Sequence, residues 1–241
     1  MRELIAASNS IAVFTGAGIS TESGIPDFRS PGGVWDKYQP IYFDDFMRSE
    51  DMRRESWRRK VHSDRVITEA KPNSGHVAVA TLAKRGKVNA VITQNIDNLH
   101  QASGITDEQV IELHGNSTYA RCLDCDKRYE LQPIFSAFAD SETLPICEEC
   151  HGIIKTATIS FGQPMPEMAM LRAQAATEVC DLFLVLGSSL SVYPAAGFPE
   201  YAARLGTPLV IINRDPTGLD HLAQIVIHDE IGKTLVSATA T

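Results

Sequence analysis

The sequence predicts an α/β protein, with a parallel sheet covered by helices on both faces and a smaller domain inserted into it. Two observations support this prediction. Short apolar runs typical of buried strands alternate with helical patterns along most of the chain. Two long stretches interrupt this alternation, and the second contains four of the five cysteines in two close pairs.

The expected strands are four apolar runs, at residues 11–14, 88–92, 182–186 and 208–212. Helical patterns lie between them, for example at 76–85 and 167–177. Polar, turn-prone sequence follows each run, at 15–18, 93–95, 187–189 and 213–215. Ligands of open parallel sheets bind beyond the carboxyl ends of the strands. We therefore expect a ligand site where these polar segments meet.

The two interrupting stretches are residues 31–73 and 119–154. The first is rich in aromatic and charged residues, with a helix expected around 51–61, and the second shows little apolar periodicity. Both are long for simple crossovers. We expect them to form one small helical and zinc-binding domain, and residues 1–30, 74–118 and 155–241 to form a Rossmann-like domain.

Composition and charge narrow the class of protein. The chain has 22 Lys and Arg against 30 Asp and Glu, a net charge of −8. A general nucleic-acid binder needs surplus positive charge, so we expect no stable nucleic-acid binding. There is no leader pattern and no apolar run of the roughly 20 residues that span a bilayer. We expect a soluble, cytoplasmic protein with no membrane partner.

The paired cysteines predict a metal site. Cys122 and Cys125 form one CxxC pair and Cys147 and Cys150 the other, at a separation near that of a four-cysteine zinc ribbon. Four thiolates fill a tetrahedral ion and leave no position for substrate, so the zinc is expected to be structural. Cys180 precedes an apolar run and is expected to be a small buried hydrophobe.

A glycine loop follows the first expected strand. Gly16 and Gly18 would let the backbone approach a pyrophosphate at a helix start. Alone this pattern is weak, since a simple tight turn explains it equally well. The next glycine is Gly24, and no ribose-binding acid follows at the usual spacing, which argues against a nicotinamide dehydrogenase.

Several further motifs occur in a particular order: SGIPDFRS at 23–30, QNID at 94–97, LHG at 113–115, the cysteine pairs, FG at 161–162, GSS at 187–189, VYP at 192–194 and Asn213. On these motifs the sequence resembles the sirtuin family from about Ile11 to Gly232. The resemblance implies an NAD-dependent protein-lysine deacetylase, which transfers acetyl groups from lysine to ADP-ribose and releases nicotinamide. It also implies one structural Zn(II) per chain and acetylated proteins or peptides as substrates.

The resemblance also implies the site residues. The NAD site would comprise Gly16, Ala17, Gly18, Thr21, Asp27, Phe28, Arg29, Gln94, Asn95, Ile96, Asp97, His114, Gly187, Ser188, Ser189, Asn213 and Ile231. The catalytic residues would be His114, with Asn95 and Asp97 positioning ribose hydroxyls and water. The acyl-lysine peptide would add as a strand between two segments, contacting Ile159, Phe161, Gly162, Val192 and Tyr193.

The expected chemistry agrees with a histidine base. A ribose hydroxyl must lose a proton during acyl transfer, and a histidine with a pKa near 6.5 can accept it at neutral pH. His114 is the candidate. His100 lies where a helix should begin, and we interpret it as structural or as supporting the site.

The sequence leaves one alternative activity open. A mono-ADP-ribosyltransferase on the same fold would use a protein nucleophile in place of the acyl-lysine.

Three features bear on the preference for the substrate. Gln163 stands where the family usually has glutamate, and residues 155–158 lack its common arginine-proline, so these two departures affect substrate preference. Sirtuins that prefer acidic acyl groups carry a tyrosine and an arginine three positions apart; here Glu55 and Arg58 align with them, which predicts uncharged acyl groups.

Overall fold

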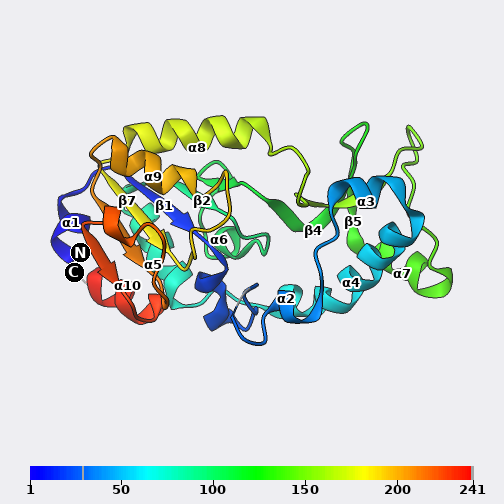
Figure 1. Cartoon of the computed structure of the whole chain (residues 1–241), viewed down its shortest axis with the longest axis horizontal. Coiled ribbons are helices and arrows are strands. Elements are labelled where there is room, and N and C mark those ends of the chain that lie inside the picture. Colours follow the sequence, from blue (N-terminus) through cyan, green and yellow to red (C-terminus); the bar gives the residue numbers. More distant parts are fainter. Residues whose placement is uncertain (29, 240–241) are drawn as a thin grey trace.

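The computed structural model describes residues 1–28 and 30–239, and its largest feature is a six-stranded parallel sheet (Figure 1). The strands lie in the order β3-β2-β1-β7-β8-β9. Their bounds are β1 (Ile11–Thr15), β2 (Val88–Thr93), β3 (Val110–Glu112), β7 (Leu182–Leu186), β8 (Leu209–Ile212) and β9 (Ile225–Ile227). The four strands predicted from sequence match β1, β2, β7 and β8 to within a residue at each end.

The strand order identifies the crevice of the sheet. Counted in chain order within this sheet, it is 3-2-1-4-5-6, the order of a doubly wound dinucleotide-binding sheet. The order reverses between β1 and β7, which pair in parallel with Thr15 opposite Leu186. Ligands of such sheets bind beyond the carboxyl ends of the strands at this point. The predicted Rossmann-like fold is confirmed.

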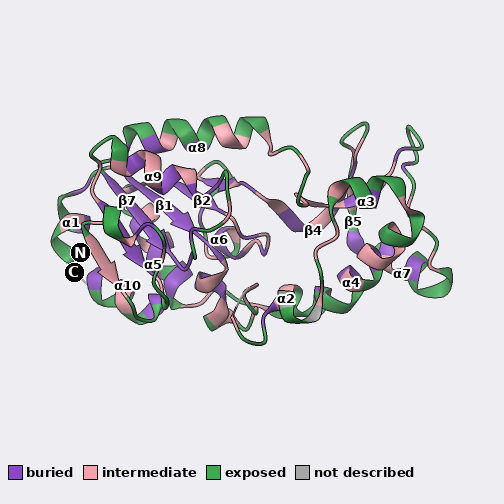
Figure 2. Ribbon diagram, viewed as in Figure 1, coloured by how far each residue is buried: buried purple, intermediate pink, exposed green. Residues whose placement is uncertain are grey.

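Helices cover both faces because successive strand residues point to opposite sides. Val13 and Leu184 pack with α5 (Ser74–Lys84), α10 (Ile231–Thr239) and α1 (Arg2–Ala7). Phe14 and Phe183 pack with α8 (Glu167–Val179) and α9 (Gly197–Arg204). Figure 2 shows the buried strands enclosed between these two helical layers. α5 begins after Asn73, whose side chain caps the helix by accepting from the backbone of Gly75 and His76.

A smaller antiparallel sheet lies at the end of the molecule opposite the N-terminus (Figure 1). Its order is β5-β4-β6, with bounds β4 (Gly115–Cys122), β5 (Arg128–Glu130) and β6 (Ile154–Thr158). The helices α2 (Val34–Lys37), α3 (Phe43–Arg48) and α4 (Glu50–Glu69) belong to the first interrupting stretch, and α7 (Leu131–Ser141) to the second. Trp57 of α4 shares one hydrophobic cluster with Ala120, Phe138 and Cys147, so both interrupting stretches contribute to one core.

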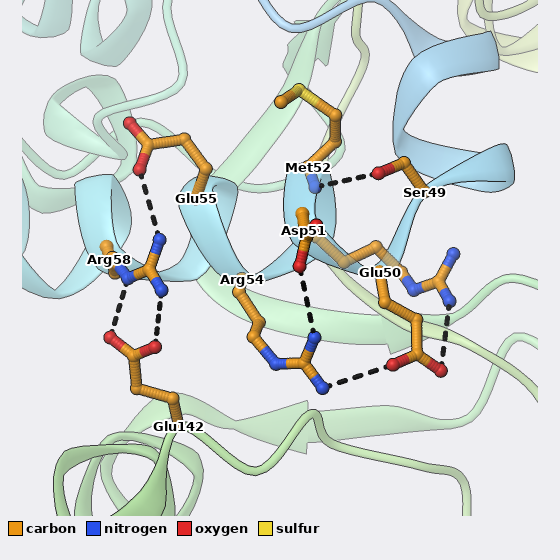
Figure 3. A network of polar contacts seen from close by, with 9 residues as sticks. Ser49, Glu50, Asp51, Met52, Arg54, Glu55, Arg58 and Glu142 are labelled. Atoms are coloured by element: carbon orange, nitrogen blue, oxygen red, sulfur yellow. Dashed lines mark hydrogen bonds and ion pairs between the residues drawn. The ribbon is translucent and has the colours of Figure 1, made fainter.

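The exposed side of α4 carries an ion network (Figure 3). Arg58 donates from Nε to Glu142, just after α7, at 2.6 Å, and also pairs with Glu55 at 3.6 Å. Arg54 pairs with Glu50 and Asp51 at the start of the helix. Exposed pairs of this kind contribute about 0–1 kcal/mol each. The network therefore orients α4 against α7, and the burial of Trp57 adds hydrophobic stabilisation.

Four elements differ from the sequence-based expectations. The helix expected around residues 51–61 extends over Glu50–Glu69, because i,i+4 ion pairs support its polar faces. The cysteine stretch contains α7, with Leu131, Ile134 and Phe138 buried along one face. The strands β3 and β9, of three residues each, were not predicted. Within residues 1–28 and 30–239, no helix is long and apolar enough to cross a membrane.

Candidate functional site

The glycine loops after β1 and β7 meet at the switch point of the sheet. A Cβ atom added to Gly16 or Gly18 would lie 2.7 or 2.8 Å from the carbonyl oxygen of Gly187. Gly187 itself has φ +63°, and the backbone N–H of Gly18 donates to its carbonyl at 2.9 Å. The two loops approach each other closely, mainly through backbone atoms. This leaves a cradle of backbone groups of the kind that binds a dinucleotide pyrophosphate.

The segment after this cradle forms η1 (Ala17–Ser23), a 3₁₀ helix that begins at the half-buried Ala17. Thr21 donates from its hydroxyl to the carbonyl of Gly18 at 2.9 Å. The Asp27 carboxylate accepts from the backbone and hydroxyl of Ser30, and Phe28 is half-buried. Arg29, also predicted to contact NAD, lies outside the described residues.

Asn95 and Asp97, two of the predicted catalytic residues, follow β2 and both hydrogen-bond the same hydroxyl group. Ser20 donates to the Asp97 carboxylate at 2.7 Å and accepts from the Asn95 amide at 3.2 Å. All three side chains are buried. The carbonyl of Ile96 accepts from the backbone and hydroxyl of Ser117, which ties this segment to β4. No local sequence pattern distinguishes Ser20, and only the fold brings it to Asn95 and Asp97.

His114 lies immediately before β4, beside the same segment. Its Nδ1 is 3.0 Å from the Gln94 carbonyl oxygen. A carbonyl only accepts, so Nδ1 carries the proton and Nε2 keeps its lone pair. Burial lowers the pKa of His114, and the Gln94 carbonyl opposes this shift. The imidazole is therefore neutral at pH 7, with Nε2 as its basic atom.

Behind the site, His100 anchors a chain of buried hydroxyls. It lies in α6 (Leu99–Ala102), and its Nε2 is 2.9 Å from the Thr15 hydroxyl. Thr15 donates to Thr93, which in turn accepts from the Asn95 backbone at 3.0 Å. Because Thr15 gives its only proton to Thr93, His100 donates from Nε2. Burial, with a smaller effect of His76, lowers the pKa of His100 to about 3, so it stays neutral and supports Asn95.

The other predicted cofactor residues lie around the carboxyl ends of β7 and β8. Gln94 donates to the Ser188 hydroxyl at 2.8 Å and so joins the loop after β2 to the loop after β7. Ser189 is exposed, and its hydroxyl hydrogen-bonds to that of Ser191. The side-chain amide of Asn213 donates to the backbone carbonyl of Asp215. Ile231 is buried at the start of α10. The side chains of Ser189 and Asn213 thus make local contacts, whereas Ile231 belongs to the hydrophobic core of the sheet.

The predicted peptide residues lie on two segments. Ile159 donates its backbone N–H to the His114 carbonyl at 2.8 Å, so the first segment begins beside the histidine. Phe161 and Gly162 follow on an exposed turn, where Gly162 has φ +80°. On the second segment Val192 is half-buried and Tyr193 is 60% exposed.

The four predicted metal ligands come together. The Sγ atoms of Cys122, Cys125, Cys147 and Cys150 all lie within 4.8 Å of one another. A tetrahedral ion with Zn–S bonds of about 2.3 Å requires sulfur atoms about 3.8 Å apart, so the cluster fits one zinc ion. The Tyr129 hydroxyl donates to Cys147 at 3.1 Å, a contact that orients a ligand. Cys180 is buried apart from this cluster and donates to the Thr177 carbonyl.

The crowding at Gly187 gives a prediction. A Cβ atom at this position would lie 2.4 Å from the Ile19 nitrogen, on a backbone with positive φ. We expect Gly187→Ala to lower the free energy of unfolding by about 1–3 kcal/mol and to raise the KM for NAD. Gly86→Ala is the matched control, because Gly86 has φ +73° with nothing within 4 Å. Equal losses in both variants, measured by urea denaturation, would contradict the clash.

The fold and this site together define a dinucleotide-binding α/β protein with a four-thiolate metal centre. The Sir2 family model matches residues 16–194, more than half of the chain. An NAD-dependent protein deacetylase of Rhodopseudomonas palustris is 55% identical over 233 residues, covering 97% of this chain and 92% of the relative. One from Thermodesulfovibrio yellowstonii is 46% identical over 233 residues, covering 97% and 90%.

Solved structures agree with these sequence relatives. A structure described as Sir2–p53 peptide–NAD+ superposes with a TM-score of 0.87 at 36% identity, covering 98% of this chain and 94% of that one. A Sir2Tm structure with a propionylated peptide gives a TM-score of 0.85 at 36% identity, with the same coverage. The chain belongs to the Sir2, or sirtuin, family.

Proposed function

We propose that the protein is an NAD-dependent protein-lysine deacetylase that transfers the acetyl group to ADP-ribose and releases nicotinamide. The observation that carries this proposal is the neutral His114, held by the Gln94 carbonyl with Nε2 as its basic atom. It lies beside the Ser20-linked Asn95 and Asp97, next to the dinucleotide crevice. The sequence relatives named NAD-dependent protein deacetylases support the same activity.

The residues of the chain would act as follows. NAD supplies an anomeric carbon whose bond to the positively charged nicotinamide can break. Asn95 and Asp97 would orient ribose hydroxyls and water, and Ser20 fixes both side chains. His114 Nε2 would accept the proton of a ribose hydroxyl, which prepares that oxygen to take the acetyl group. The remaining predicted NAD residues, at the glycine cradle and the ends of β7 and β8, would hold the dinucleotide.

Substrate would bind by strand addition. The acyl-lysine peptide would lie between the segment containing Ile159, Phe161 and Gly162 and the segment containing Val192 and Tyr193. Solved Sir2 structures with p53 and propionylated peptides support acylated peptides as the substrate class. The Ile159–His114 hydrogen bond would bring the peptide beside the base.

Domain roles follow from the same proposal. Residues 1–30, 74–118 and 155–241 would form the NAD-binding domain, and residues 31–73 and 119–154 the small helical and zinc-binding domain. The zinc would be structural, since four thiolates complete its coordination. We place the protein in the cytoplasm, acting on acetylated proteins there.

Product analysis tests the activity. Purified protein is incubated with NAD and an acetyl-lysine peptide, and the products are separated by mass spectrometry. Nicotinamide, free lysine peptide and acetylated ADP-ribose in equal amounts are the expected result. An ADP-ribosylated protein or peptide, with no acetylated ADP-ribose, would instead identify a mono-ADP-ribosyltransferase.

The acyl preference gives a further prediction. The guanidinium of Arg58 is engaged by Glu142 on one edge and faces Glu55 on the other, which leaves it no edge for an acyl carboxylate (Figure 3). We expect acetyl-lysine to be processed at least about tenfold more efficiently than succinyl-lysine, a difference of about 1.4 kcal/mol. The measurement is kcat/KM on matched peptides. Faster turnover of succinyl-lysine would refute the assignment of Glu55 and Arg58.

A further inference from the structure

Lys155 of β6 is a buried cation without an acidic partner. Lys155 is 4% exposed. Among residues 1–28 and 30–239, no carboxylate lies within ion-pair distance of its ammonium group. Burial alone lowers the pKa of Lys155 to about 8. The surroundings therefore disfavour the charge, and an apolar side chain of similar length would avoid that cost.

The ammonium group contacts its own strand, β6, and the helix α3. It donates to the carbonyl of Thr158, the last residue of β6, and to the carbonyl of Thr156 at 3.5 Å. It also lies 5.8 Å from the ring centroid of Phe46, a buried residue of α3. Pairing between β4 and β6 is irregular here, since the register shifts between Gly115 and Ala120. Lys155 thus adds a side-chain contact at the end of β6, where Thr158 pairs with Gly115 beyond the register shift.

The segment that follows Thr158 is held at two further points. Ile159 donates to the His114 carbonyl at 2.8 Å. Phe161 accepts at its carbonyl from the Phe43 backbone at 2.9 Å, and its ring lies 6.0 Å from that of Tyr42. Phe43 begins α3, the helix that also carries Phe46. The segment is therefore attached to the catalytic histidine, to α3 and, through β6, to Lys155.

We propose that Lys155 is a positioning residue for the acyl-lysine peptide, holding the end of β6 and α3 in the arrangement that presents residues 159–162 as a pairing edge. This inference rests on the proposed function, because it assumes that residues 159–162 bind the peptide. The ammonium group touches neither the crevice glycines nor His114. Its effect should therefore fall on peptide binding and spare both NAD binding and the chemical step.

Two variants test the proposal. Lys155→Met keeps the length and apolar stem of the side chain and removes its donors, whereas Lys155→Arg keeps a cation and donors. We expect the methionine variant to raise the peptide KM about tenfold, with kcat and the KM for NAD within about twofold of wild type. The arginine variant should recover most of the peptide affinity. Lys84→Met, on the exposed end of α5, is the control and should change none of these values.

Stability separates positioning from a structural role. We expect the free energy of unfolding of Lys155→Met to equal or exceed that of wild type, because a buried charge is removed. An unchanged peptide KM, or a loss confined to kcat, would overturn the proposal. If Lys155→Met and Lys155→Gln both unfold well below the wild-type temperature, Lys155 is structural and the proposal fails. A wild-type protein that forms no acetylated ADP-ribose would instead count against the proposed function.

Discussion

Replacing His114 by alanine is expected to reduce deacetylation by roughly 10²–10⁴-fold, the usual contribution of a general base. Nε2 of this residue is the basic atom beside the Asn95–Asp97 segment, and alanine offers no proton acceptor. The affinity for NAD should change little, since the glycine cradle does not involve the imidazole. Nicotinamide exchange should survive better than net turnover, because nicotinamide leaves before the ribose hydroxyl reacts. Steady-state deacetylation and isotope exchange measure the two rates.

A control and a pH profile sharpen this test. His62→Ala, on an exposed position of α4, should retain wild-type activity. Burial lowers the pKa of His114 below 6.5, so its neutral form persists to lower pH than that of a free histidine. Wild-type kcat/KM should therefore fall only at a lower pH than a free histidine would give, as the pH drops through the lowered pKa. Deacetylation by His114→Ala at a rate near wild type would show that the base lies elsewhere.

Removal of any one zinc ligand should cost metal and folding together. Zinc binding and folding are coupled in such sites, with apparent binding energies of about 10–16 kcal/mol in zinc-finger peptides. We expect alanine at Cys122, Cys125, Cys147 or Cys150 to abolish zinc binding and to unfold the small sheet. Cys147 and Cys122 belong to the same hydrophobic cluster as Trp57, so α4 should lose its packing as well.

Elemental analysis and thermal denaturation measure this effect. Wild type should contain about one zinc per chain. Cys180→Ala should contain the same amount, because Cys180 is buried at the end of α8, apart from the cluster. A metal-free variant with wild-type stability and activity would show that the four cysteines do not form a structural site.

The parts of the fold predicted from sequence are those with strong local patterns. The runs that became β1, β2, β7 and β8 are continuous apolar segments followed by turns. β3 and β9 have only three residues each, too few to show a period. α7 lies in the stretch judged to have little apolar periodicity, so its buried face, with Leu131, Ile134 and Phe138, was not predicted.

For the site as well, the features with a local sequence pattern were predicted and those that depend on tertiary contacts were not. Cysteine spacing is a local signal, and the four thiols meet as predicted. The link from Ser20 to Asn95 and Asp97 depends on side chains more than 70 positions apart. The support that His100 gives through Thr15 likewise exists only once β1 and β2 pair. Such contacts are products of tertiary structure, and a single sequence carries no local pattern for them.

The path of the chain between His114 and Ile159 connects the four-cysteine cluster with the contact between these two residues. These two residues are joined by one backbone hydrogen bond, and β4, the four cysteines and β6 all lie between them. Bringing the ends of so long a loop together costs chain entropy, which grows with the logarithm of the free length. A metal that ties Cys122 to Cys150 removes much of that free length. In the proposed enzyme, a zinc ion bound there would raise the effective concentration of residues 159–162 at His114, without contacting either one.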